Sequence, residues 1–142
     1  MGFGERNQAI GLVLGLAAFV AYWAIVIVRA ATDGLPFAEV AWQGPMLWSV
    51  GLGGGLYAVV YGTMRWRARG SRVTDERDAE IERHAEAVGA GLTGLAVLAT
   101  LIMLALDVDT FWAAHVLFVG AFLGSMAGSA ASLAAYREGV DR

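Results

Sequence analysis

Residues 88–106 read VGAGLTGLAVLATLIMLAL, a stretch without any charged side chain. A helix of roughly 17–25 apolar residues crosses a hydrocarbon core of about 30 Å, so this stretch is long enough to span a membrane. Two more apolar runs precede it in the sequence, at residues 8–28 and 45–64, and a third follows at residues 111–134. The sequence therefore predicts an all-α, polytopic membrane protein with four transmembrane helices in an antiparallel bundle.

The composition agrees with that prediction. Of the 142 residues, 58% are hydrophobic, against about 45–50% in an average soluble domain. A water-soluble chain of this length has too little interior to hide so much apolar surface. We therefore expect residues 1–142 to form a single membrane domain, in which residues 65–87 make a central loop.

The arginines predict the orientation, because the chain has no lysine. With four crossings, one side of the membrane receives Arg6, then Arg65, Arg67, Arg69, Arg72, Arg77 and Arg83, then Arg137 and Arg142. The other side receives Arg29 alone. Loops rich in arginine stay in the cytoplasm, which predicts that both termini and the central loop are cytoplasmic.

The central loop has a basic half and an acidic half. Arg65, Arg67, Arg69 and Arg72 fall in the basic half, and we expect them to lie against anionic lipid headgroups. Residues 75–86 hold six acidic side chains, and they read as a helix that continues into the third crossing and extends it into the cytoplasm. An apolar stripe of Ile81, Ala85, Val88 and Leu92 is expected along this helix.

Two interpretations of this helix stay open, and one of them is a binding site for a cytoplasmic protein. The side chains expected to take part are Asp75, Glu76, Arg77, Asp78, Glu80, Ile81 and Arg83. The alternative is a solvated helix that only caps the third crossing.

This segment also carries a resemblance. Asp75-Glu76-Arg77-Asp78-Ala79-Glu80-Ile81, the opening Glu5-Arg6-Asn7, the pair Phe111-Trp112 and the ending Ala135-Tyr136-Arg137-Glu138-Gly139 resemble an uncharacterised family of small bacterial four-helix membrane proteins. The resemblance implies four helices and a place in the bacterial inner membrane. It implies no catalytic or ligand-binding residue.

Small residues recur every fourth position on the last predicted helix. Gly120, Gly124 and Gly128 are followed by Ser132, which makes a smooth strip on which another helix can pack closely. Packing within the chain is the favoured interpretation. The alternatives are a contact between copies in a homo-oligomer and a strip that lines a pore.

A polar cluster is predicted near the outer end of the helices. The side chains expected at or near that end are Asp33, Glu39, Asp107, Asp109 and His115, with Gln43 close by. Carboxylates and one imidazole could converge there on a divalent ion. We favour a hydrogen bond from His115 to Glu39, to Gln43 or to a carbonyl across the bundle, without metal. The other acids near that end have local roles, because Asp33 precedes a turn at Gly34 and Asp109 is placed to cap the last helix.

Several functions are disfavoured by residues that the chain lacks. It has no cysteine, which excludes thiol redox chemistry, thiolate zinc sites and iron–sulfur clusters. No nucleophile, base and orienting group stand at a recognisable spacing, so we expect no enzyme and no cofactor. A net charge of −3 gives no support to nucleic-acid binding.

The predicted function is therefore that of a scaffold or regulatory membrane protein, which binds a partner through its charged segment at residues 65–86. The alternative is a small oligomeric transporter or channel with glycine-lined helix interfaces. Coupled carriers usually hold an ionised side chain deep in the membrane, and the four apolar runs contain no acid and no arginine.

Overall fold

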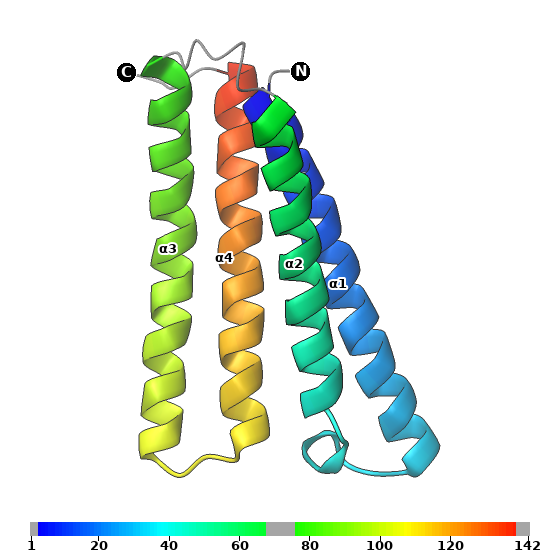
Figure 1. The fold of residues 1–142 in the computed structure, drawn as a ribbon. Helices are drawn as coiled ribbons and strands as arrows, with labels where there is room; N and C mark the ends of the chain where they lie inside the picture. Colours follow the sequence, from blue (N-terminus) through cyan, green and yellow to red (C-terminus); the bar gives the residue numbers. More distant parts are fainter. Residues whose placement is uncertain (1–2, 68–75, 139–142) are drawn as a thin grey trace. The chain divides into compact units, whose positions relative to one another are not determined.

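The computed structural model of the chain is built from helices (Figure 1). It describes residues 3–67 and 76–138, and it describes side chains for residues 9–63, 66 and 80–135. In chain order the elements are α1 (Phe3–Asp33), the short 3-10 helix η1 (Phe37–Glu39), α2 (Gln43–Arg67), α3 (Glu76–Ala105) and α4 (Thr110–Glu138). The described ranges contain no β-strand, which confirms the all-α prediction.

Three of these helices are long and apolar enough to cross a membrane. They are residues Ala9–Asp33 of α1, Glu80–Ala105 of α3 and Thr110–Ala135 of α4. The remaining long helix, α2, is not among them. Its mean hydropathy is lower, because glycine, tryptophan and tyrosine are interspersed with its leucines and valines. The described helices thus support a membrane protein, while a crossing by α2 stays a prediction.

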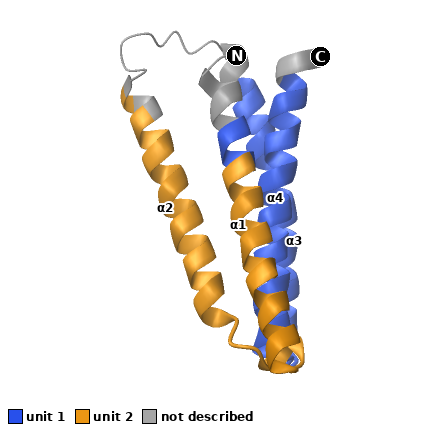
Figure 2. Ribbon diagram, turned by 90° about the vertical axis from the view of Figure 1, so that its right-hand side faces the viewer, with its two compact units in different colours: residues 1–12, 72–142 blue, residues 13–71 orange. Residues whose placement is uncertain are grey.

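The chain divides into two compact units (Figure 2). Unit 1 comprises residues 1–12 and 72–142, and its main feature is the hairpin of α3 and α4. Unit 2 comprises residues 13–71, and it contains most of α1, η1 and α2.

Unit 1 turns sharply between α3 and α4. Asp107 has a φ of 54°, and its N–H donates to the carbonyl of Leu104 while the N–H of Val108 donates to that of Met103. These two bonds are the Schellman arrangement that satisfies the last carbonyls of a helix. The Asp109 carboxylate then accepts a bond of 2.8 Å from the N–H of Phe111, which confirms the predicted N-cap of α4.

The two helices of unit 1 lie side by side, with small residues at their interface. The α3 line that faces α4 includes Ala85, Gly89, Thr93 and Ala96, whereas large α3 side chains such as Leu95 point away, 65% exposed. A lipid environment favours this distribution, because leucine gains nothing by leaving lipid for a helix interface, while small residues allow close backbone contact.

Only part of the expected apolar stripe on α3 is covered. Ile81 and Ala85 are buried, at 1% and 4% exposure, whereas Leu92 is 42% exposed. The line that faces α4 passes through Gly89 and Thr93, which are half-buried. The size and hydrophobicity of a side chain do not predict which α3 residues face α4, since a close contact between helices selects small side chains.

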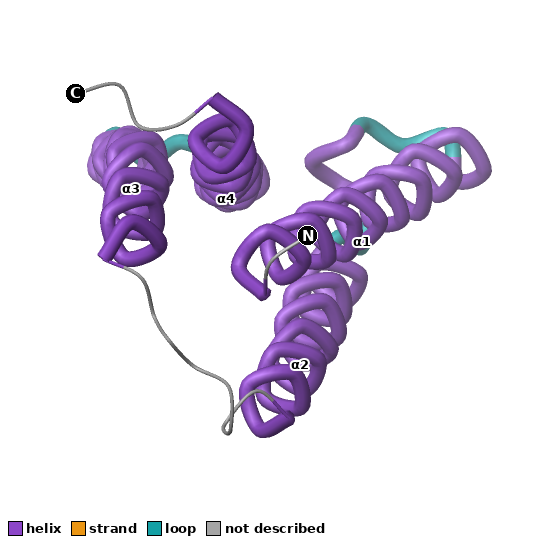
Figure 3. The backbone as a smooth tube through the Cα atoms, turned by 90° about the horizontal axis from the view of Figure 1, so that it is seen from above, coloured by secondary structure: helices purple, strands orange, loops and turns teal. Residues whose placement is uncertain are grey.

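Unit 2 begins its turn at Gly34, which has a φ of 64° directly after the end of α1. The N–H of Leu35 donates to the carbonyl of Ala30, so this turn, too, is of the Schellman type. In the view from above, the axes of α1 and α2 run in clearly different directions (Figure 3). The two helices touch where the Ser49 hydroxyl donates a 3.0 Å bond to the carbonyl of Ala18.

Candidate functional site

The predicted helix-packing residues of α4 lie against α3 of the same chain. A Cβ at Gly128 would be 2.8 Å from the carbonyl oxygen of Ala85, and one at Gly124 would be 2.7 Å from that of Gly89 and closer still to the Thr93 hydroxyl. A Cβ at Gly120 would collide with the Cβ of Ala96. These positions therefore exclude any side chain larger than hydrogen while the helices keep their present separation.

Hydroxyl groups add polar contacts to this interface. Thr100, which is buried, donates to the carbonyl of Ala96 one turn earlier at 2.8 Å and lies 3.3 Å from the carbonyl of Ala113 on α4. Thr93 donates to the carbonyl of Gly89 at 3.0 Å. Ser132 ends the small-residue strip and is 2% exposed.

The first described turns of α3 separate buried from exposed side chains clearly. Ile81 and Ala85 are buried, whereas the exposed positions are Glu80, Glu82, Arg83, His84 and Glu86. Since α3 is continuous from Glu76 to Ala105, these turns are rigidly joined to the apolar span. The structure thus gives the predicted partner-binding segment one buried line and one charged, accessible surface.

Part of the predicted site falls outside the described residues. Asp75 is not described, and the side chains of Glu76, Arg77 and Asp78 are not described although their backbone is helical. Of the four arginines expected at the headgroups, Arg69 and Arg72 also lie outside the described residues, and for Arg65 and Arg67 only the backbone is described.

The predicted polar cluster near the outer end is divided between the two units. Glu39 and Gln43 are exposed residues of unit 2, and His115 is a buried residue of unit 1. Within the part of the chain that the structure describes, no three histidine, aspartate or glutamate side chains come close enough together to hold a metal ion.

His115 has a bonding partner on its own helix. Its Nδ1 lies 2.6 Å from the carbonyl oxygen of Phe111, one turn earlier, and the two rings are stacked at a tilt with centroids 3.9 Å apart. A carbonyl only accepts, so Nδ1 must carry the hydrogen. This bond differs from the contacts across the bundle that we expected, because the carbonyl four residues earlier is within reach of the ring.

No family model, curated protein or solved structure matches the chain. The resemblance of residues 75–81 to a family of small membrane proteins therefore stays a prediction.

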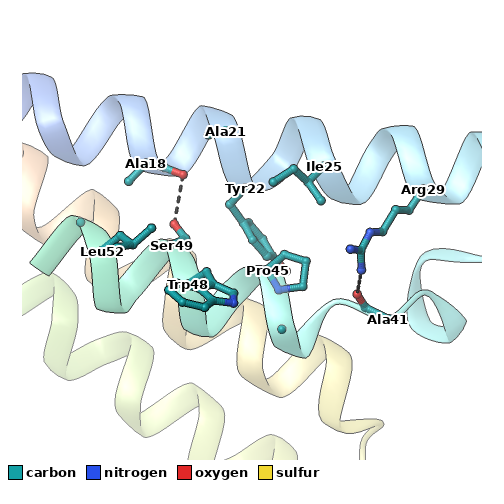
Figure 4. A pocket seen from close by; sticks show the side chains of 12 residues that line it. Ala18, Ala21, Tyr22, Ile25, Arg29, Ala41, Pro45, Trp48, Ser49 and Leu52 are labelled. Carbon is teal, nitrogen blue, oxygen red and sulfur yellow. Dashed lines mark hydrogen bonds between the residues drawn. The ribbon is translucent and has the colours of Figure 1, made fainter. Parts of the chain in front are cut away.

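Sequence reasoning missed a groove between α1 and α2 in unit 2 (Figure 4). Its volume is about 560 Å³. The large apolar side chains that line it are Tyr22 and Ile25 of α1 and Pro45, Trp48 and Leu52 of α2. The only signal in the sequence is weak: small residues such as Ala18, Ala21, Gly44 and Gly53 recur near large ones, and they leave the space that the groove occupies.

The groove has a polar contact near each end. Close to one end, the Ser49 hydroxyl bonds to the Ala18 carbonyl, and at the other the Nη1 of Arg29 donates a 2.7 Å bond to the carbonyl of Ala41 (Figure 4). Arg29 is the same residue that stands alone in the predicted outer loop. The groove is thus apolar along its length, and the guanidinium of Arg29, held by the Ala41 carbonyl, lies at one end.

Proposed function

We propose that this chain is a membrane-embedded adaptor, which crosses a bacterial inner membrane four times with both termini in the cytoplasm. Through the first turns of α3 it binds a cytoplasmic protein that has a basic surface. The arginine distribution supports the orientation, and the three apolar helices support the membrane location.

One observation carries the proposal. The helix α3 runs unbroken from the charged segment into the apolar span, and Ile81 and Ala85 are buried while their charged neighbours are exposed. A solvated helix end would normally fray, whereas this one is held along its buried line. A fixed array of charges loses little conformational entropy when a partner binds to it.

The charge of this surface indicates the partner. Three of its side chains are acidic, namely Glu80, Glu82 and Glu86, and all three are exposed. A basic surface on a soluble protein complements them, and such complementarity raises the rate and selectivity of encounter more than the affinity. We therefore expect a moderate affinity that weakens as salt is added.

The alternative function, a small oligomeric transporter or channel, has less support. The strongest argument for it was the glycine strip of α4, and Gly120, Gly124 and Gly128 are in contact with α3 of the same chain. These contacts lie within the chain, so the strip gives the pore and the contact between copies less support than it gives packing of α4 on α3.

The test is affinity capture from native membranes with a tag placed after Arg142. A triple variant with Glu80→Gln, Glu82→Gln and Glu86→Gln keeps the helix, since glutamine and glutamate have similar helix propensities. The matched control replaces the exposed acids of unit 2 by Asp33→Asn and Glu39→Gln. We expect one stoichiometric protein with the wild type and with the control, and its loss with the triple variant. Equal recovery with the triple variant would exclude these turns as the docking site.

A further inference from the structure

The groove in unit 2 has the dimensions of an acyl chain within one leaflet. From Ala18 to Arg29 the α1 wall rises about 16 Å, at about 1.5 Å per residue. One leaflet of a hydrocarbon core about 30 Å thick is about 15 Å deep. The volume of about 560 Å³ also falls within the roughly 300–1,000 Å³ of typical small-molecule sites.

The geometry of the two helices keeps this space open. The two helices touch at Ala18, where a Cβ at Gly53 would lie 3.2 Å from the Ala18 Cβ. The groove extends from this contact toward Arg29 (Figure 4). Ala21 and Gly44 line the groove, and they are too small to fill it. An apolar cavity that opens to lipid is filled by the most abundant apolar group there, which is a lipid chain.

Arg29 gives the open end a charge that the described residues do not neutralise. Its Nη1 is fixed by the Ala41 carbonyl, and no carboxylate among the described residues pairs with the guanidinium. A guanidinium has five N–H donors in a planar fork that matches phosphate, so donors remain after the bond to Ala41. A fixed arginine is a better phosphate ligand than a mobile one, since less side-chain freedom is lost on binding.

A second hollow adjoins the first. It is lined by Leu47 and Gly51 together with three residues that the two hollows share, Gly44, Trp48 and Leu52. Two adjoining apolar hollows around one exposed tryptophan suit a molecule with two chains. A tryptophan at this level is also typical of the membrane interface, where headgroups begin.

We propose that unit 2 binds one anionic phospholipid as a specific ligand. Its phosphate lies against the free donors of Arg29, one acyl chain lies along Tyr22, Pro45 and Trp48 down to the contact of Ser49 with Ala18, and the second chain lies in the adjoining hollow. The site is independent of the α3 surface proposed for the protein partner, because the two use different residues in different units.

The experiment measures phospholipid that stays with the protein. The chain is purified in a mild detergent, incubated with micelles that contain equal amounts of phosphatidylglycerol and phosphatidylcholine, and separated by gel filtration. Bound phospholipid per chain is then determined by mass spectrometry. We expect about one phosphatidylglycerol per protein molecule and little phosphatidylcholine, because the choline cation of phosphatidylcholine neutralises its phosphate and repels Arg29.

Two variants and one control locate the site. Arg29→Gln removes the cation, and Ala21→Leu fills the groove. Ala24→Leu adds the same side chain at an exposed α1 position that does not line it. We expect the first two to lower phosphatidylglycerol retention about tenfold or more, as for the loss of one hydrogen bond to a charged group, and Ala24→Leu to change nothing. Helicity and melting temperature establish that each variant is folded.

The outcomes separate the lipid from other occupants. Equal retention of both phospholipids by all four proteins would mean an ordinary lipid shell and would overturn the proposal. If inorganic phosphate alone displaces phosphatidylglycerol, the site binds the headgroup and not the acyl chains. That result also contradicts the proposal. If the groove is instead covered by a second copy, Ala21→Leu will shift the molecular mass of the protein without changing lipid retention.

Discussion

Gly128 of α4 lies so close to Ala85 of α3 that a Cβ at position 128 would be 2.8 Å from the Ala85 carbonyl oxygen. The obstacle is backbone, so it cannot move aside as the end of a flexible side chain would. We expect Gly128→Ala to force α3 and α4 apart and to lower stability by about 1–3 kcal/mol, the usual cost of overpacking. Thermal unfolding in detergent, followed by circular dichroism, measures this loss.

The control is Gly91→Ala on α3, where no atom lies within 4 Å of the added Cβ. There the methyl group should be neutral or should stabilise by about 0.5–1 kcal/mol, because alanine is the better helix former. If both variants melt alike, the close approach of the helices contributes nothing to stability.

A second prediction concerns the hydroxyl of Thr100, which contacts carbonyls of both α3 and α4. Thr100→Val keeps the shape and removes the bond. We expect a loss near the membrane average of about 0.6 kcal/mol and no more than about 1.7. Thr63→Val is the matched control, since the exposed Thr63 hydroxyl bonds only to the Val60 carbonyl of its own helix. A greater loss at Thr63 than at Thr100 would contradict the role of the buried contact.

The third prediction uses the two turns. Asp107 has a positive φ, which costs residues with a Cβ about 1–2 kcal/mol. Asp107→Gly should therefore stabilise the protein by about 1 kcal/mol, whereas Gly34→Ala should destabilise it by a similar amount, since Gly34 has the same conformation. The two melting temperatures should move in opposite directions, and a shift of both in one direction would disprove the conformational explanation.

His115 provides the fourth prediction. Its imidazole is bonded to the Phe111 carbonyl and stacked on the Phe111 ring, so we expect a structural role. His115→Gln should fold and lose no more than about 1 kcal/mol, the scale measured for hydrogen bonds between membrane helices. Melts of the wild type, His115→Gln and Glu39→Gln are compared with metal analysis of each. Stoichiometric metal in the wild type that either substitution removes would instead make the polar cluster a metal site.

The fifth prediction is the topology. Reporters inserted at Gly70 or fused after Arg142 should be cytoplasmic, and one inserted at Gly34 should be external, because nine of the ten arginines belong to one side. This experiment also decides whether α2 crosses the membrane. An external signal from Gly70 would mean that it does not, and the orientation would have to be reversed for the second half of the chain.

Much of the local structure follows from the sequence itself. The four apolar runs predicted four helices, the acidic segment predicted that α3 begins well before its apolar span, and Asp109 and Gly34 predicted a helix start and a helix end. These features are local, since a cap or a turn depends on a few neighbouring residues. The helices are longer than the apolar runs because a helix can continue beyond the hydrocarbon core of the membrane.

The tertiary structure decided which surface of each helix is covered. Leucines fill both buried and exposed positions of a membrane helix, so hydrophobicity does not mark the interior as it does in water. For that reason the sequence did not show that Ile81 is buried while Leu92 of the same apolar stripe is exposed, and it left open whether the glycines of α4 meet α3 or another copy. The sequence did not show the groove beside Arg29 either, because it lies between two helices whose contact joins Ala18 of α1 to Ser49 and Gly53 of α2, residues far from Ala18 in the chain.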